Sequence, residues 1–381
     1  MVSSKVLNSV EKKNYEKVLD KERIREEFLL DPDYPPRPKR FNKILIIFAT
    51  IIFFSFGVFL TCYFNPKLFK LLTRRQGQID SVEFRNAYQK EENENTFLKR
   101  EKIFLNNVKR IQEYNSKNPG VTFDINHFAY WSDEEISSIF MQKKEQIPFF
   151  QLSNYSSYKF ENNLPDYFDW RKSSNPVVTR VKDQGQCGSY WAFSVVAAIE
   201  SQFAIKKKML LSLSEQELVD CDVQSKGCQG GYVQTALLYA MEKGLETDTD
   251  YPYSGIQHNQ CSYKKEKVLV KIDNAYKLKA DEDLIANVVA NNGPVSFLMP
   301  VPRSFMSYRS GIFNPSWAEC QTQAVGNHVI TIVGFGREGN LRYWIVKNSF
   351  GTGWGEQGYF RMARGFNVCG FTNNVFTPMI N

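Results

Sequence analysis

Residues 184–193 read QGQCGSYWAF, a glycine-containing loop that runs into an apolar stretch. Residues 191–205 (WAFSVVAAIESQFAI) contain neither Gly nor Pro and repeat apolar residues at helical steps, which predicts a buried helix beginning near Ser189. A loop followed by a helix N-terminus is a typical setting for a catalytic nucleophile. This loop offers the phenol of Tyr190 where that chemistry needs a thiol, so the stretch leaves open whether the chain is an enzyme.

Strands are predicted in the C-terminal part of the chain. Residues 328–335 (HVITIVGF), 342–348 (RYWIVKN) and 359–363 (YFRMA) are rich in β-branched and aromatic residues and are separated by Gly clusters. A helical first half and an antiparallel second half predict an α+β protein of two lobes. We expect a functional site in the cleft between the lobes.

Two polar residues lie at the open end of a predicted hairpin. If residues 328–335 and 342–348 pair symmetrically about Glu338, His328 lies opposite Asn348. An amide beside a histidine can fix the ring and leave the second ring nitrogen free to act on a nucleophile. The alternative is a packed hairpin that ends in a His and an Asn without a catalytic role.

An uncharged apolar run follows a charged N-terminal tail. Residues 44–64 (ILIIFATIIFFSFGVFLTCYF) cover 21 positions without a charge. At about 1.5 Å per residue, such a helix crosses a hydrocarbon core roughly 30 Å thick. We expect a transmembrane anchor here, preceded by a cytosolic tail. A cleaved signal peptide fits less well, because such segments lie at the extreme N-terminus and have shorter apolar runs.

The cysteines indicate the compartment of the globular part. Of seven cysteines, Cys62 lies in the apolar run and the other six follow residue 186. An even set in one region is typical of a disulfide framework formed in an oxidising compartment. This predicts a single-pass type II membrane protein with a lumenal, vacuolar or extracellular C-terminal domain. The alternatives are buried free thiols in a cytosolic protein and zinc ligation, which the lack of a paired C-x-x-C disfavours.

Composition excludes some classes of protein. A hydrophobic content of 43% is enough to fill a core, so the chain is not generally disordered. The net charge of +7 comes without a basic stripe interleaved with aromatic residues, so we expect no nucleic-acid partner. We also expect no metal and no cofactor.

A helix is predicted over the stretch from Phe97 to Asn115, because six residues recur there at three- and four-residue steps. They are Phe97, Arg100, Phe104, Asn107, Ile111 and Asn115. A second short helix is predicted to start at Ser132, where Ser-Asp-Glu-Glu has the spacing of a capping box. Taken alone, these helices form an amphipathic pair that packs on another part of the chain.

Five ordered motifs resemble the papain family of cysteine proteases: DQGQCGSYWAFS, SLSEQELVDC, GCQGGY, NHVITIVGFG and KNSFGTGWGEQGYFRM. The resemblance covers about residues 164–381, and His328 follows Tyr190 at the family's usual interval. It implies a papain-like α+β fold with a helical lobe and an antiparallel β-barrel lobe. The upstream set from Arg100 to Asn115 resembles the family's inhibitory prosegment signature, with Thr96 in place of its leading Glu.

The resemblance implies a catalytic role for three residues that the chain retains. His328 resembles the general base, Asn348 the group that orients it and Gln184 the oxyanion-hole side chain. Tyr190 occupies the place of the nucleophilic Cys. A phenol with an ordinary pKa of about 10 is ionised to about one part in a thousand at pH 7. Its oxygen also extends beyond the position of a cysteine sulfur, so we expect it to overshoot the imidazole and plug the cleft.

The resemblance also implies substrate-binding positions. Gly230 and Gly231 resemble the wall that pairs with a peptide backbone, and Trp354 a further substrate-binding residue. Phe350 replaces the Trp that the family carries beside its catalytic Asn. The family would pair Cys187 with Cys228, Cys221 with Cys261, and Cys320 with Cys369, one choice among several.

The predicted organisation has four parts: a cytosolic tail (1–43), a transmembrane anchor (44–64), a stem with an inhibitor-type prosegment (65–160) and a papain-like peptidase domain (161–381). An anchored prosegment is similar to that of the membrane-anchored vacuolar proteases of parasitic protists. The partners implied are polypeptide substrates or sister proteases, the chain's own prosegment, and the membrane through residues 44–64.

Three hypotheses follow for the function. The first is a peptidase homologue whose proteolytic activity is lost or strongly reduced because of Tyr190, and which acts by binding peptides or sister proteases. The second is an active papain-like endopeptidase in a lysosome-like vacuole, which applies if Tyr190 is a sequence variant or an error. The third is a structural protein that keeps the fold only for its stability.

Overall fold

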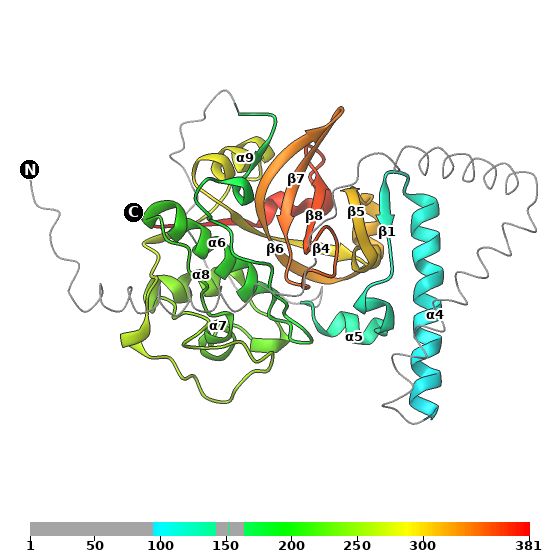
Figure 1. Ribbon diagram of the computed structural model, residues 1–381, viewed down its shortest axis with the longest axis horizontal. Coiled ribbons are helices and arrows are strands. Elements are labelled where there is room, and N and C mark those ends of the chain that lie inside the picture. The colour runs from blue at the N-terminus through cyan, green and yellow to red at the C-terminus, as the bar shows by residue number, and fades with distance from the viewer. Residues whose placement is uncertain (1–93, 142–151, 153–163) are drawn as a thin grey trace, which may run out of the picture. The chain divides into compact units, whose positions relative to one another are not determined.

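A computed structural model describes residues 94–141, 152 and 164–381 (Figure 1). The tail predicted at residues 1–43 and the anchor predicted at 44–64 lie outside the described residues. The α+β fold of two lobes is confirmed, and an additional N-terminal segment, residues 94–141, packs on the strand-rich lobe.

The prediction of a single-pass membrane protein is not supported. Within residues 94–141 and 164–381 no helix is both long and apolar enough to cross a membrane. The longest of these helices, α4 (Glu94–Lys117), has the length but reads ENTFLKREKIFLNNVKRIQEYNSK, in which charged residues recur throughout. The apolar helix α6 (Tyr190–Lys207) is buried within the protein from Tyr190 to Ala204.

The N-terminal segment begins with α4, followed by β1 (Val121–Phe123), the 3₁₀ helix η1 (His127–Tyr130) and α5 (Asp133–Ser138). The capping box predicted at Ser132 is present: its hydroxyl accepts a hydrogen bond from the backbone N–H of Glu135, whose carboxylate accepts one from the backbone N–H of Ser132. The same carboxylate receives two hydrogen bonds from Arg100, which ties α4 to α5. The face of α4 predicted from the residues between Phe97 and Asn115 therefore packs against the rest of the N-terminal segment.

The helical lobe contains α6, α7 (Glu215–Cys221) and α8 (Val233–Glu242), with η3 (Gly227–Gln229) and η4 (Lys265–Lys267). These helices gather in the green part of Figure 1. Helix α6 is buried on all sides because the other helices of this lobe cover part of its surface and strand β6 of the second lobe covers another part. Its first turn is thereby fixed at the junction of the two lobes.

The second lobe is a mostly antiparallel sheet in the order β1-β5-β8-β7-β6-β4-β9-β3, with β2 pairing to β6. The strands are β2 (Phe168–Asp169), β3 (Asn274–Lys277), β4 (Val295–Pro302), β5 (Tyr308–Phe313), β6 (Ala324–Glu338), β7 (Leu341–Lys347), β8 (Tyr359–Ala363) and β9 (Val375–Met379). Helices α9 (Glu282–Asn291) and α10 (Trp317–Thr322) and the 3₁₀ helices η2 (Trp170–Lys172), η5 (Arg303–Ser307) and η6 (Val368–Asn374) complete the lobe. Strand β1 adds the N-terminal segment to the edge of this sheet (Figure 1).

The predicted hairpin is present, but its symmetric register is wrong. The turn is made by Gly339 and Asn340, because Glu338 pairs with Leu341. Gly339 has a φ of +58°, a conformation that a tight turn favours and that glycine adopts without strain. An irregularity between Ile332 and Gly334 then shifts the pairing again, so that Thr331 faces Lys347. The strands therefore do not place His328 directly opposite Asn348.

Three disulfides join the described cysteines. They connect Cys187 to Cys228, Cys221 to Cys261, and Cys320 to Cys369. These are the pairs that the resemblance implies. No thiol remains among residues 164–381, and Cys62 lies outside the described residues.

Candidate active site

Tyr190 is the first residue of α6, with Ser189 as its N-cap. The side chain is fully buried, and its ring centroid lies 5.5 Å from that of His328 at an interplanar angle of 64°. The hydroxyl reaches Gly230: a Cβ atom on that residue would lie 2.9 Å from the Tyr190 oxygen. The phenol thus extends from the imidazole to one of the two glycines expected to contact a peptide.

His328 and Asn348 meet through their side chains, as predicted, although the register that predicted it is wrong. Nε2 of His328 lies 2.8 Å from Oδ1 of Asn348. The same Oδ1 accepts a hydrogen bond from the backbone N–H of Ser349, so it is the amide oxygen and Nε2 carries the proton. Nδ1 is then the basic nitrogen. It is buried and has no hydrogen-bond partner among the described residues.

Aromatic rings enclose the imidazole. Phe350 stacks on it at 4.9 Å with an angle of 16°, and Phe140 meets it at 5.1 Å and 89°. Tyr190 is the third ring, and Phe305 is a fourth at 6.4 Å. Burial lowers the pKa of His328 from 6.5 to about 4, and the hydrogen bond with Asn348 opposes this only in part. The ring is therefore neutral at pH values well above 4.

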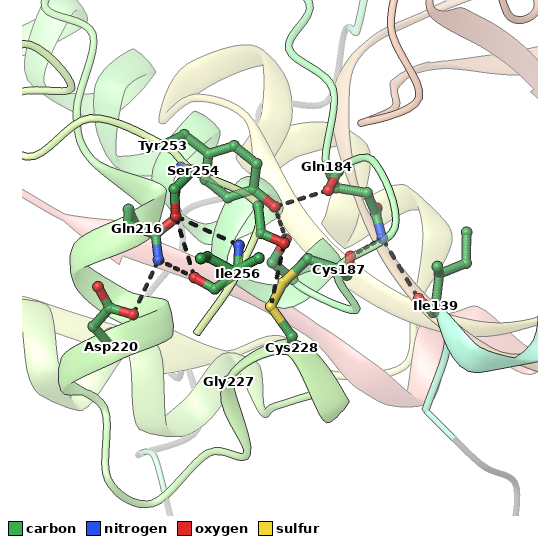
Figure 2. Close-up of a disulfide and its surroundings, with 12 residues drawn as sticks. Ile139, Gln184, Cys187, Gln216, Asp220, Gly227, Cys228, Tyr253, Ser254 and Ile256 are labelled. Carbon is green, nitrogen blue, oxygen red and sulfur yellow. Dashed lines mark hydrogen bonds between the residues drawn. A yellow bond between two sulfur atoms is a disulfide. The ribbon is translucent and has the colours of Figure 1, made fainter. Parts of the chain in front are cut away.

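Gln184 is buried with its amide group occupied (Figure 2). Its Nε2 donates to the carbonyl oxygen of Cys187 at 2.9 Å and approaches that of Ile139 at 3.5 Å, while its Oε1 accepts a hydrogen bond from Ser349. Ile139 belongs to the N-terminal segment. A backbone carbonyl of that segment thus lies at the amide expected to stabilise an oxyanion.

The Ser189 hydroxyl points away from the imidazole. It lies 2.7 Å from the hydroxyl of Tyr253. The Tyr253 hydroxyl in turn donates to the backbone carbonyl of Gln184 at 2.8 Å (Figure 2). These contacts hold Ser189 within the helical lobe. A serine beside the Tyr190 position is therefore not placed to react with a group at His328.

The remaining predicted binding residues differ in their surroundings. Gly231 packs on the indole of Trp191, where a Cβ atom would lie 2.4 Å from Cε2. Trp354 is fully buried, and its indole N–H points at the backbone carbonyls of Phe305 and Met306. It meets Phe350 edge to face at 5.5 Å. Trp354 therefore supports the ring that stacks on His328.

Two contributors to the site were missed from the sequence, Ile139 and Phe140. Both belong to the N-terminal segment, just beyond α5. The apolar run that follows the capped helix was the available signal. Ile139 and Phe140 contact Gln184 and His328, which lie far away in the sequence. A local sequence pattern does not identify such contacts.

A buried ionic cluster lies behind the site. Lys182 contacts Glu200 at 3.1 Å and Glu215 at 2.6 Å, and Lys347 donates to Thr179 at 2.8 Å. The two lysines and the two glutamates line a cavity of about 20 Å³ that extends to Asn348 and has room for about one water molecule. Burial lowers the pKa of Lys347 to about 8. Among the described residues no group of three or more His, Cys, Asp or Glu side chains could hold a metal ion.

Comparisons with known families match most of the chain. The model of the papain family cysteine proteases matches residues 164–379, and that of the cathepsin propeptide inhibitor domain (I29) matches residues 82–136.

Similar proteins cover both regions. A cathepsin L-like proteinase of Fasciola hepatica is 37% identical over 307 residues, which are 78% of this chain and 92% of that protein. Pro-cathepsin H of Mus musculus is 37% identical over 281 residues, 73% of this chain and 83% of that protein. Among solved structures, digestive procathepsin L 3 of Tenebrio molitor larval midgut superposes with a TM-score of 0.70 at 32% identity, covering 80% of this chain and 99% of that one.

Proposed function

Because the chain belongs to the papain family of cysteine proteases and carries a cathepsin propeptide inhibitor domain, we propose that it is a peptidase homologue with lost or strongly reduced proteolytic activity. It acts by binding peptides or sister proteases. The N-terminal segment is part of a stem and inhibitor-type prosegment, which we assign to residues 65–160, ahead of a papain-like peptidase domain at 161–381. The observation that carries the proposal is Tyr190 at the head of α6, beside His328.

The chemistry of the family needs a thiolate at this point. A helix N-terminus and a neighbouring imidazolium lower the pKa of a thiol, so that a nucleophile exists at working pH. A phenol has an ordinary pKa of about 10, and the same surroundings lower this pKa too little to produce a phenolate at working pH. His328, held neutral by burial, supplies no positive charge to help it. We therefore expect no acyl-enzyme on Tyr190.

No other described residue is placed to replace the missing nucleophile. The six cysteines of residues 164–381 are all in disulfides, and the Ser189 hydroxyl is held by Tyr253. The base and its orienting amide thus have no nucleophile to act on. What the site keeps is its ability to hold a peptide backbone, as Asn327 holds that of Met141 in a β-bridge.

A second candidate function is an active papain-like endopeptidase. The intact contact between His328 and Asn348 and the buried position of Gln184 favour it. These groups would serve catalysis at once if residue 190 were a cysteine. This candidate applies to a form of the chain in which Tyr190 is replaced.

The proposal is tested by comparing the chain with its Tyr190→Cys variant. Both are given one protease cleavage site between residues 146 and 164, so that the N-terminal segment can be released in the same way. Hydrolysis of fluorogenic peptides is then measured. We expect the unaltered chain to be at least about a thousandfold slower than the variant. Comparable rates would refute the proposal.

Two controls complete this experiment. Tyr190→Cys combined with His328→Ala should lose the restored activity, which shows that the new thiol uses the native base. A Tyr190→Cys variant that stays inactive would show that the site has decayed elsewhere. Peptide binding by the unaltered chain separates a working receptor from a purely structural protein.

A further inference from the structure

One buried hydroxyl group connects the two lobes behind the site. Oγ1 of Thr179 donates a hydrogen bond to the Glu200 carboxylate at 2.5 Å and accepts one from the Lys347 ammonium group at 2.8 Å. Glu200 lies on α6 of the helical lobe, and Lys347 is the last residue of β7 in the strand-rich lobe. We call the connection made by Glu200, Thr179 and Lys347 the Thr179 link.

Both ends of the Thr179 link belong to elements that carry the site. Glu200 is on the helix that begins with Tyr190. Lys347 immediately precedes Asn348, whose side chain meets His328 at 2.8 Å. A change in the Thr179 link would therefore move residue 190 relative to the imidazole.

The sheet alone holds Asn348 on one side only. The pairing of β6 with β7 ends where Thr331 faces Lys347, so Asn348 lies one residue beyond it. Toward β8, the backbone N–H of Asn348 donates to the carbonyl of Gly358 at 3.0 Å. The anchored side chain of Lys347 therefore fixes the strand end from which Asn348 projects.

The members of the Thr179 link are all buried, at 1% exposure for Glu200, 6% for Lys347 and 8% for Thr179. Taking a charged group out of water is unfavourable unless hydrogen bonds replace the lost water. Within the described residues, Thr179 makes the one hydrogen bond to the Lys347 ammonium group. The hydroxyl of Thr179 therefore determines where this ammonium group lies.

We propose that Thr179 is a positioning residue: its hydroxyl holds α6 and the end of β7 together and so sets the position of the His328–Asn348 pair relative to residue 190. The hydroxyl acts through Lys347 and Glu200, because its two hydrogen bonds go to these residues. This inference goes beyond the proposed function and does not rest on it, because an inactive homologue and an active peptidase share this arrangement.

A pair of variants separates the hydroxyl from the packing of Thr179. Valine keeps the branched shape of threonine but has no hydroxyl, whereas serine keeps the hydroxyl and lacks the methyl group. If Thr179 only fills space, Thr179→Ser should disturb the site more than Thr179→Val. If the hydroxyl joins the lobes, Thr179→Val should disturb it more.

The test measures exchange of the His328 Nε2–H proton with solvent by NMR, in the full chain at about pH 7, where the ring is neutral. In the parent this proton is donated to Oδ1 of Asn348. We expect Thr179→Val to accelerate its exchange at least about tenfold, and Thr179→Ser less than about threefold. No acceleration in Thr179→Val, or an equal or larger one in Thr179→Ser, would overturn the inference.

Thr331→Val is the matched control. Thr331 is also buried and faces Lys347 from β6, but its hydroxyl donates to the backbone carbonyl of Ser194 at 3.1 Å. The variant removes a hydroxyl from the same region and leaves the Thr179 link intact, so exchange should change less than about threefold. An effect as large as that of Thr179→Val would show that general loosening exposes the proton, and the inference would be wrong.

Lys347→Met tests the other end of the Thr179 link. It should accelerate exchange about as much as Thr179→Val, and the double variant should be no faster than the faster single variant, because both changes break one connection. Effects that multiply in the double variant would show that the two residues act separately and would contradict the inference. If Lys347→Met does not fold, the comparison of Thr179→Val with Thr179→Ser decides the question by itself.

Discussion

The phenol ring of Tyr190 lies 5.5 Å from the imidazole of His328, and the Tyr190 hydroxyl is directed at Gly230. The imidazole that the resemblance assigns as the general base is thus placed beside an aromatic ring instead of a thiolate. Phe140 and Phe350 cover other sides of the same imidazole. His328 keeps its orienting amide but has lost the anion that would stabilise its charged form.

The first prediction concerns the protonation of His328. Burial without an anionic neighbour places its pKa at about 4. A thiolate introduced by Tyr190→Cys would favour the imidazolium, so this variant should raise the pKa by more than about one unit. NMR titration of the ring resonances measures both values. An unchanged pKa in a correctly folded variant would mean that residue 190 does not face the ring.

A second prediction follows for stability in acid. The folded-state pKa of His328 is lowered from 6.5 to about 4, so between these pH values the unfolded chain binds a proton that the folded chain does not. Stability should therefore fall as pH falls from about 6.5 to 4, by about 3 kcal/mol from this residue. His328→Gln should remove this part of the pH dependence in urea unfolding. His258→Gln, at a side chain 45% exposed, is the control and should retain it.

A third prediction tests the contact between Tyr190 and Gly230. Gly230→Ala should cost about 2 kcal/mol or more in the parent, from the strained φ and from overlap with the phenol oxygen. In a Tyr190→Cys background only the strain remains, so the cost should be smaller by about 1 kcal/mol. Urea unfolding of the parent, the two single variants and the double variant gives the coupling free energy between residues 190 and 230.

Gly231→Ala is the matched control for this cycle. Its Cβ atom would meet Trp191 and not Tyr190, so its cost should be the same in both backgrounds. If Gly230→Ala lowers the free energy of unfolding equally in the parent and in the Tyr190→Cys background, the Tyr190 hydroxyl does not lie against Gly230.

A fourth prediction concerns the attachment of the N-terminal segment. Asp133 bridges Arg110 of α4, at 2.7 Å, and Arg303 of the strand-rich lobe, at 2.9 Å. The hydrogen bond with Arg110 is the main cause that lowers the pKa of Asp133 to about 2. The contribution of this carboxylate is present above its ordinary pKa of 3.8 and is lost as pH falls toward 2.

Because the Asp133 side chain is 51% exposed, solvent screening limits this contribution to about 1 kcal/mol. Asp133→Asn should therefore accelerate amide exchange of α5 by about fivefold at pH 5 and by clearly less at pH 2, where much of the carboxylate is protonated in the parent. Glu113→Gln, an exposed position on α4, should change exchange at neither pH. An effect of Asp133→Asn that is as large at pH 2 as at pH 5 would contradict the electrostatic explanation.

The sequence predicts the local elements of the site well. Helix α6 begins directly after Ser189, as its apolar pattern indicates, and the capping box at Ser132 starts α5. The contact between His328 and Asn348 is also predicted, but from a strand register that is wrong. The Gly339–Asn340 turn and the irregularity near Ile332 both change that register. Side-chain reach, rather than strand pairing, brings these two residues together.

The rest of the site depends on contacts between distant parts of the chain. Phe140 reaches His328, and Met141 pairs with Asn327, across most of the peptidase domain. Gly326 makes room for Phe140. The residues around Gly326 in the sequence do not indicate this contact. Trp354 was assigned to substrate binding by resemblance, whereas here it is buried beneath Phe350. Such relationships arise from tertiary packing and leave no periodic signal.

The central claim is that residues 164–381 hold no reactive thiol beside His328. Treating the native chain with a thiol-directed covalent inhibitor and locating any adduct by peptide mapping tests it most directly. We predict no adduct on any of the six disulfide-bonded cysteines and none on Tyr190. The Tyr190→Cys variant, treated identically, should carry one adduct at residue 190. A stoichiometric adduct in residues 164–381 of the unaltered chain would contradict the account.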